Sequence, residues 1–186
     1  MPRRKGKETA MAEDARSIGI DKLRDYPIFH DMSDEQVEAA ARSIRLIRYK
    51  KNTQIWTEGE EGDDVALLLS GEIVITQRLT LFTAGGKEAE ERDKSLIRLS
   101  AEMRPVIGEI ALCAHVPRSA SVIAATDVTL GHFTAEELEA EISRDPHFGY
   151  LLFRNLASII ARRLITANQN VLKLTTAFSL AVQRGS

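Results

Sequence analysis

Hydrophobic and polar residues follow three different patterns along the chain. From about residue 12 to 43 the apolar positions recur at helical spacing, until Pro27, which lacks a backbone N–H, ends the first segment. The apolar residues of that segment are Ile18, Ile20, Leu23 and Tyr26. Beyond it, Ser33 and Gln36 have the spacing of a capping box, so we expect Ser33 to cap a second short helix.

From about residue 44 to 133 the pattern changes to short runs rich in β-branched and apolar residues. These runs are IRLIRY, QIWTE, VALLLSG, EIVITQRLTLF, SLIRLS, ASVIAAT and VTLGHF. Gly and Asp clusters such as EGEEGDD separate them, which predicts many short strands in a barrel or jelly roll. Trp56 lies in an alternating run and is expected in the core. The polar stretch TAGGKEAEERDKS has nearly balanced charge and is expected to be a solvated hairpin loop.

From residue 134 onward the helical pattern returns. Thr134 and Glu137 have another capping-box spacing, and Pro146 fits the first turn of one helix of roughly forty residues. The apolar seam of that helix advances in steps of four and three through Phe153, Ala157, Ile160, Leu164, Ala167, Val171, Leu174, Phe178 and Ala181. This heptad spacing predicts a two-stranded parallel coiled coil that makes a homodimer. The alternative is that the seam packs on its own barrel.

Composition narrows the class of protein. The 186 residues suit one domain with an accessory helix, and a net charge of -2 gives no general attraction to nucleic acid. The single cysteine excludes an internal disulfide and favours a reducing cytoplasm. No apolar run is long enough to span a bilayer, so we expect no membrane contact. We expect a disordered basic tail at 1–11, strands with N-terminal helices at 12–145, and a dimerisation helix at 146–184.

The stretch GEIALCAHVPRSASV, residues 108–122, places an acid and an arginine in an apolar run. A guanidinium is always charged and forms paired hydrogen bonds to phosphate or carboxylate, so a buried Arg118 needs an anion. Glu109 is available in the sequence, but the two side chains need not meet. Because ionised Glu109 only accepts hydrogen bonds, it suits a hydroxyl-rich partner such as ribose.

Small residues and donors surround these two charges. Gly108 and Ala111 allow close backbone approach, and a turn that begins at GEIA presents free N–H groups to an anion. Ser119 adds a hydroxyl beside Arg118, which completes a compact phosphate pocket. Phosphate beside ribose indicates a nucleotide. One arginine without magnesium-binding carboxylates nearby favours a single, singly charged phosphate.

The segment GEIAL…PRSASV closely resembles the phosphate-binding cassette of cyclic nucleotide-binding domains, as found in catabolite activator protein and the regulatory subunit of protein kinase A. The resemblance covers roughly residues 28 to 183 and includes EGEEGDDVALLLSGEIVI and FTAEELEAEISRDPHF. It implies an α+β fold: a β-roll, a jelly-roll-like double-stranded β-helix, flanked by N-terminal helices and a long C-terminal helix. It also implies cyclic AMP or another cyclic nucleotide as the ligand, with no cofactor and no metal.

Roles follow from this resemblance residue by residue. Glu109 matches the residue that holds the ribose 2′-hydroxyl, and Arg118 matches the residue that holds the exocyclic phosphate. The remaining cassette positions of the ligand-binding set are Gly108, Ile110, Ala111, Ser119 and Ala120. Gly62 and Gly71 match turn glycines of the family.

The chain also departs from the family pattern. Arg104 and Pro105 stand in the usual lead-in to the cassette. On the long helix, the positions that read adenine in the bacterial activators hold Ala167 and Asn168, of which only Asn168 can hydrogen-bond to a base. Arg163 is placed to reach the ribose or Glu109. The helix-turn-helix that follows in those activators is absent here, so no direct DNA binding is expected.

The leading hypothesis is a cyclic nucleotide sensor, with cyclic AMP favoured, that signals to an unknown downstream protein through its helix and dimer. One alternative is a degenerate domain that acts as a dimeric adaptor. Another is a haem or gas sensor, because Cys113 and His115 are both possible iron ligands. We expect Cys113 to be a buried small hydrophobe instead. No catalytic motif indicates an enzyme.

Overall fold

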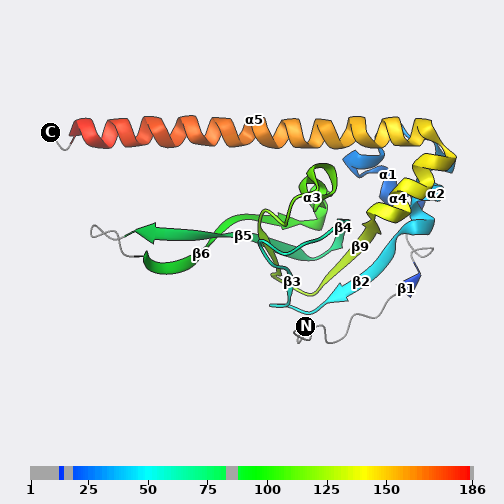
Figure 1. Cartoon of the computed structure of the whole chain (residues 1–186), viewed down its shortest axis with the longest axis horizontal. Helices are drawn as coiled ribbons and strands as arrows, with labels where there is room; N and C mark the ends of the chain where they lie inside the picture. The colour runs from blue at the N-terminus through cyan, green and yellow to red at the C-terminus, as the bar shows by residue number, and fades with distance from the viewer. Residues whose placement is uncertain (1–12, 15–18, 83–87, 185–186) are drawn as a thin grey trace.

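The computed structural model describes residues 13–14, 19–82 and 88–184 (Figure 1). Short helices come first: α1 (Ile20–Arg24), the 3-10 turn η2 (Pro27–Phe29) and α2 (Asp34–Ser43). The strands follow, with η3 (Ala101–Met103) and α3 (Glu109–Ala114) inserted among them. Two further helices, α4 (Ala135–Arg144) and α5 (Pro146–Arg184), come last. Both expected capping boxes are present, at Ser33 with Gln36 and at Thr134 with Glu137.

The strands form two antiparallel sheets that together make the expected β-roll. One sheet has the order β1-β2-β9-β4-β7 and the other the order β3-β8-β5-β6. Their bounds are β1 (Glu13–Asp14), β2 (Arg45–Tyr49), β3 (Gln54–Trp56), β4 (Asp64–Ser70), β5 (Glu72–Phe82), β6 (Glu88–Ser100), β7 (Val106–Ile107), β8 (Ser121–Ala124) and β9 (Val128–Thr134). Strands distant in sequence are therefore neighbours, which brings β4 beside both β7 and β9.

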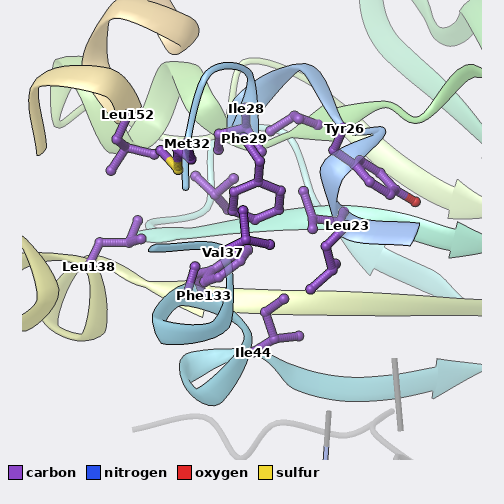
Figure 2. Close-up of a cluster of buried hydrophobic side chains, with 14 of the residues drawn as sticks. Leu23, Tyr26, Ile28, Phe29, Met32, Val37, Ile44, Phe133, Leu138 and Leu152 are labelled. Carbon is purple, nitrogen blue, oxygen red and sulfur yellow. The ribbon is translucent and has the colours of Figure 1, made fainter. Parts of the chain in front are cut away.

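The core has two parts, one on each side of the first sheet. Between the sheets lie Ile55, Trp56, Ala66, Leu68, Ile73, Ile107, Val122, Ala124, Val128 and Leu130. On the other side, the N-terminal helices and α4 pack against the sheet, and Figure 2 shows Phe29, Val37 and Phe133 converging. The rings of Phe29 and Phe133 meet edge to face at 6.2 Å between centroids. This packing fixes β4 and β9, which carry part of the site described below.

Only the first turns of α5 pack on the domain. Phe148, Leu151, Leu152 and Leu156 are buried, and buried Asn155 donates from Nδ2 to the carbonyls of Ile28 and His30. From Leu164 to Gln183 every residue is exposed, and Figure 1 shows the helix continuing straight past α3. The outer seam residues Val171, Leu174 and Phe178 therefore do not pack on their own roll.

Two expectations about secondary structure were wrong. The segment from 12 to 43 is not helical throughout, because Glu13–Asp14 pairs with β2 as a short strand; residues 15–18, including Ile18, and the tail at 1–11 lie outside the described residues. The polar stretch 83–95 is not mainly loop, because β6 begins at Glu88 and pairs with β5. Backbone pairing with a neighbouring strand outweighs the low β-propensity of these residues.

Candidate functional site

Gly108 starts the site, because it lets the chain turn from β7 into α3. Its φ is +85°, in the left-handed region that favours glycine. A Cβ here would lie 2.6 Å from the carbonyl oxygen of Asp64 and 2.7 Å from a terminal nitrogen of Arg118. The helix α3 then begins at Glu109 and ends at Ala114, and the next residue, His115, also adopts positive φ. The glycine thus permits both the turn and the close approach of the arginine.

Glu109 is almost completely buried, with 1% of its surface exposed. Its carboxylate accepts a hydrogen bond from Arg163 of α5, and the same guanidinium donates to the carbonyl of Val106 at 2.5 Å. This ion pair fastens the cassette to the long helix. Of the two partners expected for Arg163, the ribose or Glu109, the structure shows the contact with Glu109, and Glu109 and Arg118 are not paired with each other.

Arg118 is also buried, with 4% of its surface exposed. Its main chain is held by two hydrogen bonds to the preceding loop, from its N–H to Glu60 at 2.9 Å and from Gly59 to its carbonyl at 2.8 Å. Its guanidinium lies over the ring of Trp56, 3.9 Å from the centroid. A Cβ at Gly62 would lie 2.6 Å from two nitrogens of this group, so Gly62 leaves the space that the arginine fills.

Asp64 is the internal anion that Arg118 requires. Arg118 donates to its main-chain carbonyl at 2.9 Å and to its carboxylate. The second carboxylate oxygen contacts Nδ1 of buried His132 at 2.7 Å, and Nε2 of that ring lies 3.4 Å from the Tyr49 hydroxyl. Burial raises the pKa of Asp64, but the hydrogen bond and charge of His132 and the charge of Arg118 lower it below its ordinary value overall.

One donor of Arg118 is left over. Its Nε is buried and has no hydrogen-bond partner among the described residues. A buried donor without a partner is costly, so such a group is often one that a ligand satisfies. Nε belongs to a side chain that lines a cavity of about 70 Å³ at the start of α3. One hydrogen-bond donor of Arg118 is therefore left without an acceptor among the described residues.

Most of the sequence-predicted residues meet at this cavity. Its lining includes Gly108, Glu109, Ile110, Ala111, Arg118, Ser119, Ala120 and Arg163, together with the apolar walls Trp56, Ile75, Ile107 and Val122. Asn168 is not in the lining and lies exposed on α5, beyond Arg163. Ser119 is exposed, and its carbonyl accepts from Gln77 at 3.2 Å.

Sequence reasoning missed the residues behind the cavity. Trp56 was expected in the core, where it lies, but its ring face also supports Arg118. Asp64 and His132 received no role. The one available signal for Asp64 was an acid at the start of an apolar strand, and it does not reveal that β4 lies next to the cassette.

Cys113 is exposed, which contradicts its expected burial. It lies on the outer side of the short helix α3, where apolar character in the sequence does not imply burial. Partial desolvation and the charge of Glu109 raise its pKa, so the thiolate that would bind iron is disfavoured. In the described part of the chain, no three His, Cys, Asp or Glu side chains are grouped to hold a metal ion.

The comparison with protein families decides the class of the domain. The sequence profile described as the cyclic nucleotide-binding domain matches residues 46–145, more than half of the chain. The chain belongs to the cyclic nucleotide-binding domain family. The matched range contains the complete cassette from Gly108 to Ala120 and the turn glycines Gly62 and Gly71.

Proteins similar to this chain include a cyclic AMP receptor protein and a solved cyclic nucleotide-binding domain. The cyclic AMP receptor protein of Thermus thermophilus is 30% identical over 148 residues, which cover 78% of this chain and 61% of that protein. A cyclic nucleotide-binding domain from Methylobacillus flagellatus has the same fold, with a TM-score of 0.73 at 19% identity over 88% of this chain and 87% of that one. This chain spans about three fifths of the length of the first curated relatives that it matches.

One similar protein is named as an enzyme. Glutaminase 1 of Bradyrhizobium diazoefficiens is 26% identical over 159 residues, but these residues make up only 23% of that protein. The likeness is thus to a minor part of the glutaminase, whereas a Mycobacterium tuberculosis relative, 22% identical over 147 residues, is named a cAMP-activated global transcriptional regulator. Separately, none of the helices among the described residues is long and apolar enough to cross a membrane.

Proposed function

We propose that this cyclic nucleotide-binding domain is a sensor that binds cyclic AMP at the cavity beneath α5 and transmits binding through that helix. The single observation that carries the proposal is the buried Nε of Arg118, which has no hydrogen-bond partner in the part of the chain that the structure describes and belongs to a residue that lines the cavity. A phosphate oxygen is a matching acceptor for such a donor. The Thermus relative is named a cyclic AMP receptor, which favours this ligand over cyclic GMP.

The phosphate is assigned to Arg118, with Ser119 and the main chain of Gly108 to Ala111 around it. Ile110 and Ala120 also line the cavity. Asp64 accepts a hydrogen bond from the guanidinium and Trp56 lies against it, so the group is oriented before a ligand arrives. A preoriented arginine loses little conformational entropy on binding, which favours affinity.

The sugar is assigned to Glu109, whose carboxylate accepts hydrogen bonds from ribose hydroxyls. Arg163 already occupies this carboxylate, and the cavity of about 70 Å³ is far smaller than the several hundred Å³ of usual ligand pockets. A nucleotide therefore requires Arg163 to shift. Because Arg163 belongs to α5, its shift would make the contact between the helix and the cassette differ between the free and the bound state. Such a difference is what allows a ligand to change the equilibrium position of the helix.

The outer half of α5 is assigned to a homodimer. Its seam residues are exposed, with Leu174 at 71% and Phe178 at 72%, and they keep heptad spacing. In a parallel pair, Asn168 on this exposed stretch is a polar side chain available to a nucleobase. A downstream protein partner would then respond to the position of the paired helices.

Calorimetric titration of the purified chain with cyclic AMP and with cyclic GMP tests the proposal. We expect saturable binding of cyclic AMP and a loss of at least tenfold in affinity for Arg118→Gln, because a charge-assisted phosphate contact is removed. Arg98→Gln is the matched control, since Arg98 is exposed and pairs with Glu72 away from the cavity. No heat with either nucleotide for the unaltered chain, at millimolar ligand, would refute the proposal.

A further inference from the structure

His132 is a buried titratable group to which no role has yet been given. It lies in β9 between β4 and β2, opposite Ala66 and Arg45, with 5% of its surface exposed. Its Nδ1 is 2.7 Å from Oδ2 of Asp64, and its ring meets Trp56 edge to face at 6.0 Å between centroids. Both of these neighbours also contact Arg118. His132 therefore touches the two groups that support the arginine from behind.

The carboxylate of Asp64 is divided between two partners. One oxygen accepts from Arg118 and the other contacts His132, so rotation of the carboxylate would break both contacts. When the neutral imidazole carries its proton on Nδ1, it donates to Asp64, and Nε2 accepts from the Tyr49 hydroxyl at 3.4 Å. This arrangement is comparable to a carboxylate and histidine that orient each other behind a reactive group.

We propose that His132 is a positioning residue for the phosphate contact of Arg118, and that its protonation makes the affinity for a cyclic nucleotide depend on pH. The inference rests on the proposed function, because it concerns the same anion site. Through Asp64, His132 would orient the guanidinium of Arg118. When protonated, it would also add positive charge near the bound phosphate.

The sign follows from the charges within the cluster. With neutral His132, the charges of Arg118 and Asp64 cancel, whereas protonated His132 leaves a net charge of +1 facing a phosphate of −1. A singly charged phosphodiester therefore binds more tightly when His132 is protonated. Affinity is therefore high at a pH where His132 is protonated, and it falls as the pH rises and the ring loses its proton.

The other charged groups near His132 do not produce this dependence. From β4 the ring faces Asp64, whose pKa is lowered, so this carboxylate stays ionised throughout the histidine range. From β2 it faces Tyr49, whose pKa burial raises to about 12, and the register partner Arg45, whose guanidinium pairs with Glu137. From β3 it faces the uncharged ring of Trp56. Neither Asp64 nor Tyr49 therefore changes its protonation state between pH 5 and 8.

The test is titration calorimetry with cyclic AMP at pH 5.5 and pH 8.5. We expect the affinity of the unaltered chain to fall about fivefold over this interval. The effect is modest because the charge of His132 does not touch the phosphate and acts on it from behind Asp64 and Arg118. His132→Asn retains a donor at the Nδ1 position but cannot be protonated, so its affinity should not change with pH. His132→Phe retains the ring and loses the hydrogen bond, so it should bind about tenfold more weakly at both pH values.

His115→Asn is the matched control, because His115 lies exposed at the end of α3 and asparagine tolerates its positive φ. This variant should keep the fivefold dependence. As a second measurement that needs no variant, the NMR titration of the His132 ring should shift to higher pH by about 0.7 with saturating cyclic AMP, which corresponds to the same fivefold.

The outcomes separate the two proposals. If the unaltered chain binds cyclic AMP with the same affinity at both pH values, or if His132→Asn keeps the pH dependence, the role of His132 is wrong and the sensor function stands. If the unaltered chain binds no cyclic nucleotide at either pH, the proposed function fails and the role of His132 fails with it.

Discussion

Arg163 of α5 and Glu109 of α3 form an ion pair that joins the long helix to the cassette. The carboxylate is buried, whereas 42% of the arginine side chain is exposed. The two partners therefore differ in burial. Loss of the arginine would leave the buried charge of Glu109 without a partner, which destabilises the folded protein more than loss of an exposed charge does.

Arg163→Met should lower the free energy of unfolding by about 2 kcal/mol, because Glu109 keeps its charge in a buried position without a cation. Methionine preserves most of the packing of the side-chain stem. Arg162→Met is the matched control, since Arg162 is the exposed neighbour on the same helix, and it should change stability by less than about 0.5 kcal/mol. Urea unfolding followed by circular dichroism measures both. Equal losses in the two variants would contradict the importance of the pair.

Gly62→Ala should displace the guanidinium of Arg118, because the new Cβ would lie 2.6 Å from its Nε. We expect a destabilisation of about 1–3 kcal/mol and a change in the emission of the single tryptophan, on whose ring Arg118 rests. Gly19→Ala has nothing within 4 Å of its Cβ and should leave the emission unchanged. Tryptophan fluorescence and thermal unfolding, measured on Gly62→Ala and on Gly19→Ala, test this prediction. An unaltered spectrum for Gly62→Ala would show that the arginine does not need this space.

Tyr26 should make the stability of the domain sensitive to alkali. Burial raises its pKa to about 12 from 10.0, although the charge of Arg104 acts in the opposite direction, and its hydroxyl donates to Leu68 at 2.6 Å. A raised pKa stabilises the fold fully below pH 10, and this contribution is lost as the pH rises toward 12. Tyr26→Phe should cost about 1 kcal/mol at pH 7 and less at pH 11.

Urea unfolding at these two pH values measures the effect of Tyr26. Tyr150→Phe is the control, because Tyr150 is 61% exposed, and it should have little effect at either pH. A difference between Tyr26→Phe and the unaltered chain that grows with pH would be the opposite of this prediction.

Leu174→Asp should convert a dimer into a monomer of 20.7 kDa, because it places a charge in the exposed heptad seam. Gln169→Asp adds the same charge on the opposite face of α5 and should leave the dimer intact. Sedimentation equilibrium gives both masses. If the unaltered chain is a monomer, or if Leu174→Asp remains a dimer, the seam of α5 is not the interface between two copies of the chain.

The local features of this fold could be predicted from sequence. Capping boxes at Ser33 and Thr134, the run of short strands and the long α5 all depend on residues a few positions apart. The cassette was also predictable, because its acid, arginine and glycine lie within one segment. For Arg163 the sequence left two partners open, the ribose or Glu109, and the structure shows the contact with Glu109.

The residues that support the site could not be predicted in the same way. Asp64 and Arg118 are 54 positions apart, and His132 is 68 positions from Asp64, so their contacts depend on which strands become neighbours in the roll. Burial was misjudged at Cys113 for a related reason: local hydrophobicity does not tell which side of a short surface helix faces the sheet. The early strand at Glu13–Asp14 likewise depends on a distant partner, β2.

The length of α5 beyond Arg163 has a mechanical consequence. About twenty residues follow the ion pair, and at 1.5 Å per residue they form a rigid arm of about 30 Å. A tilt of only about 5° at the level of the cassette moves the far end of such an arm by about 3 Å. A side-chain shift too small to alter the β-roll is thus enlarged, at the outer end of the helix, to a displacement that another protein surface can detect.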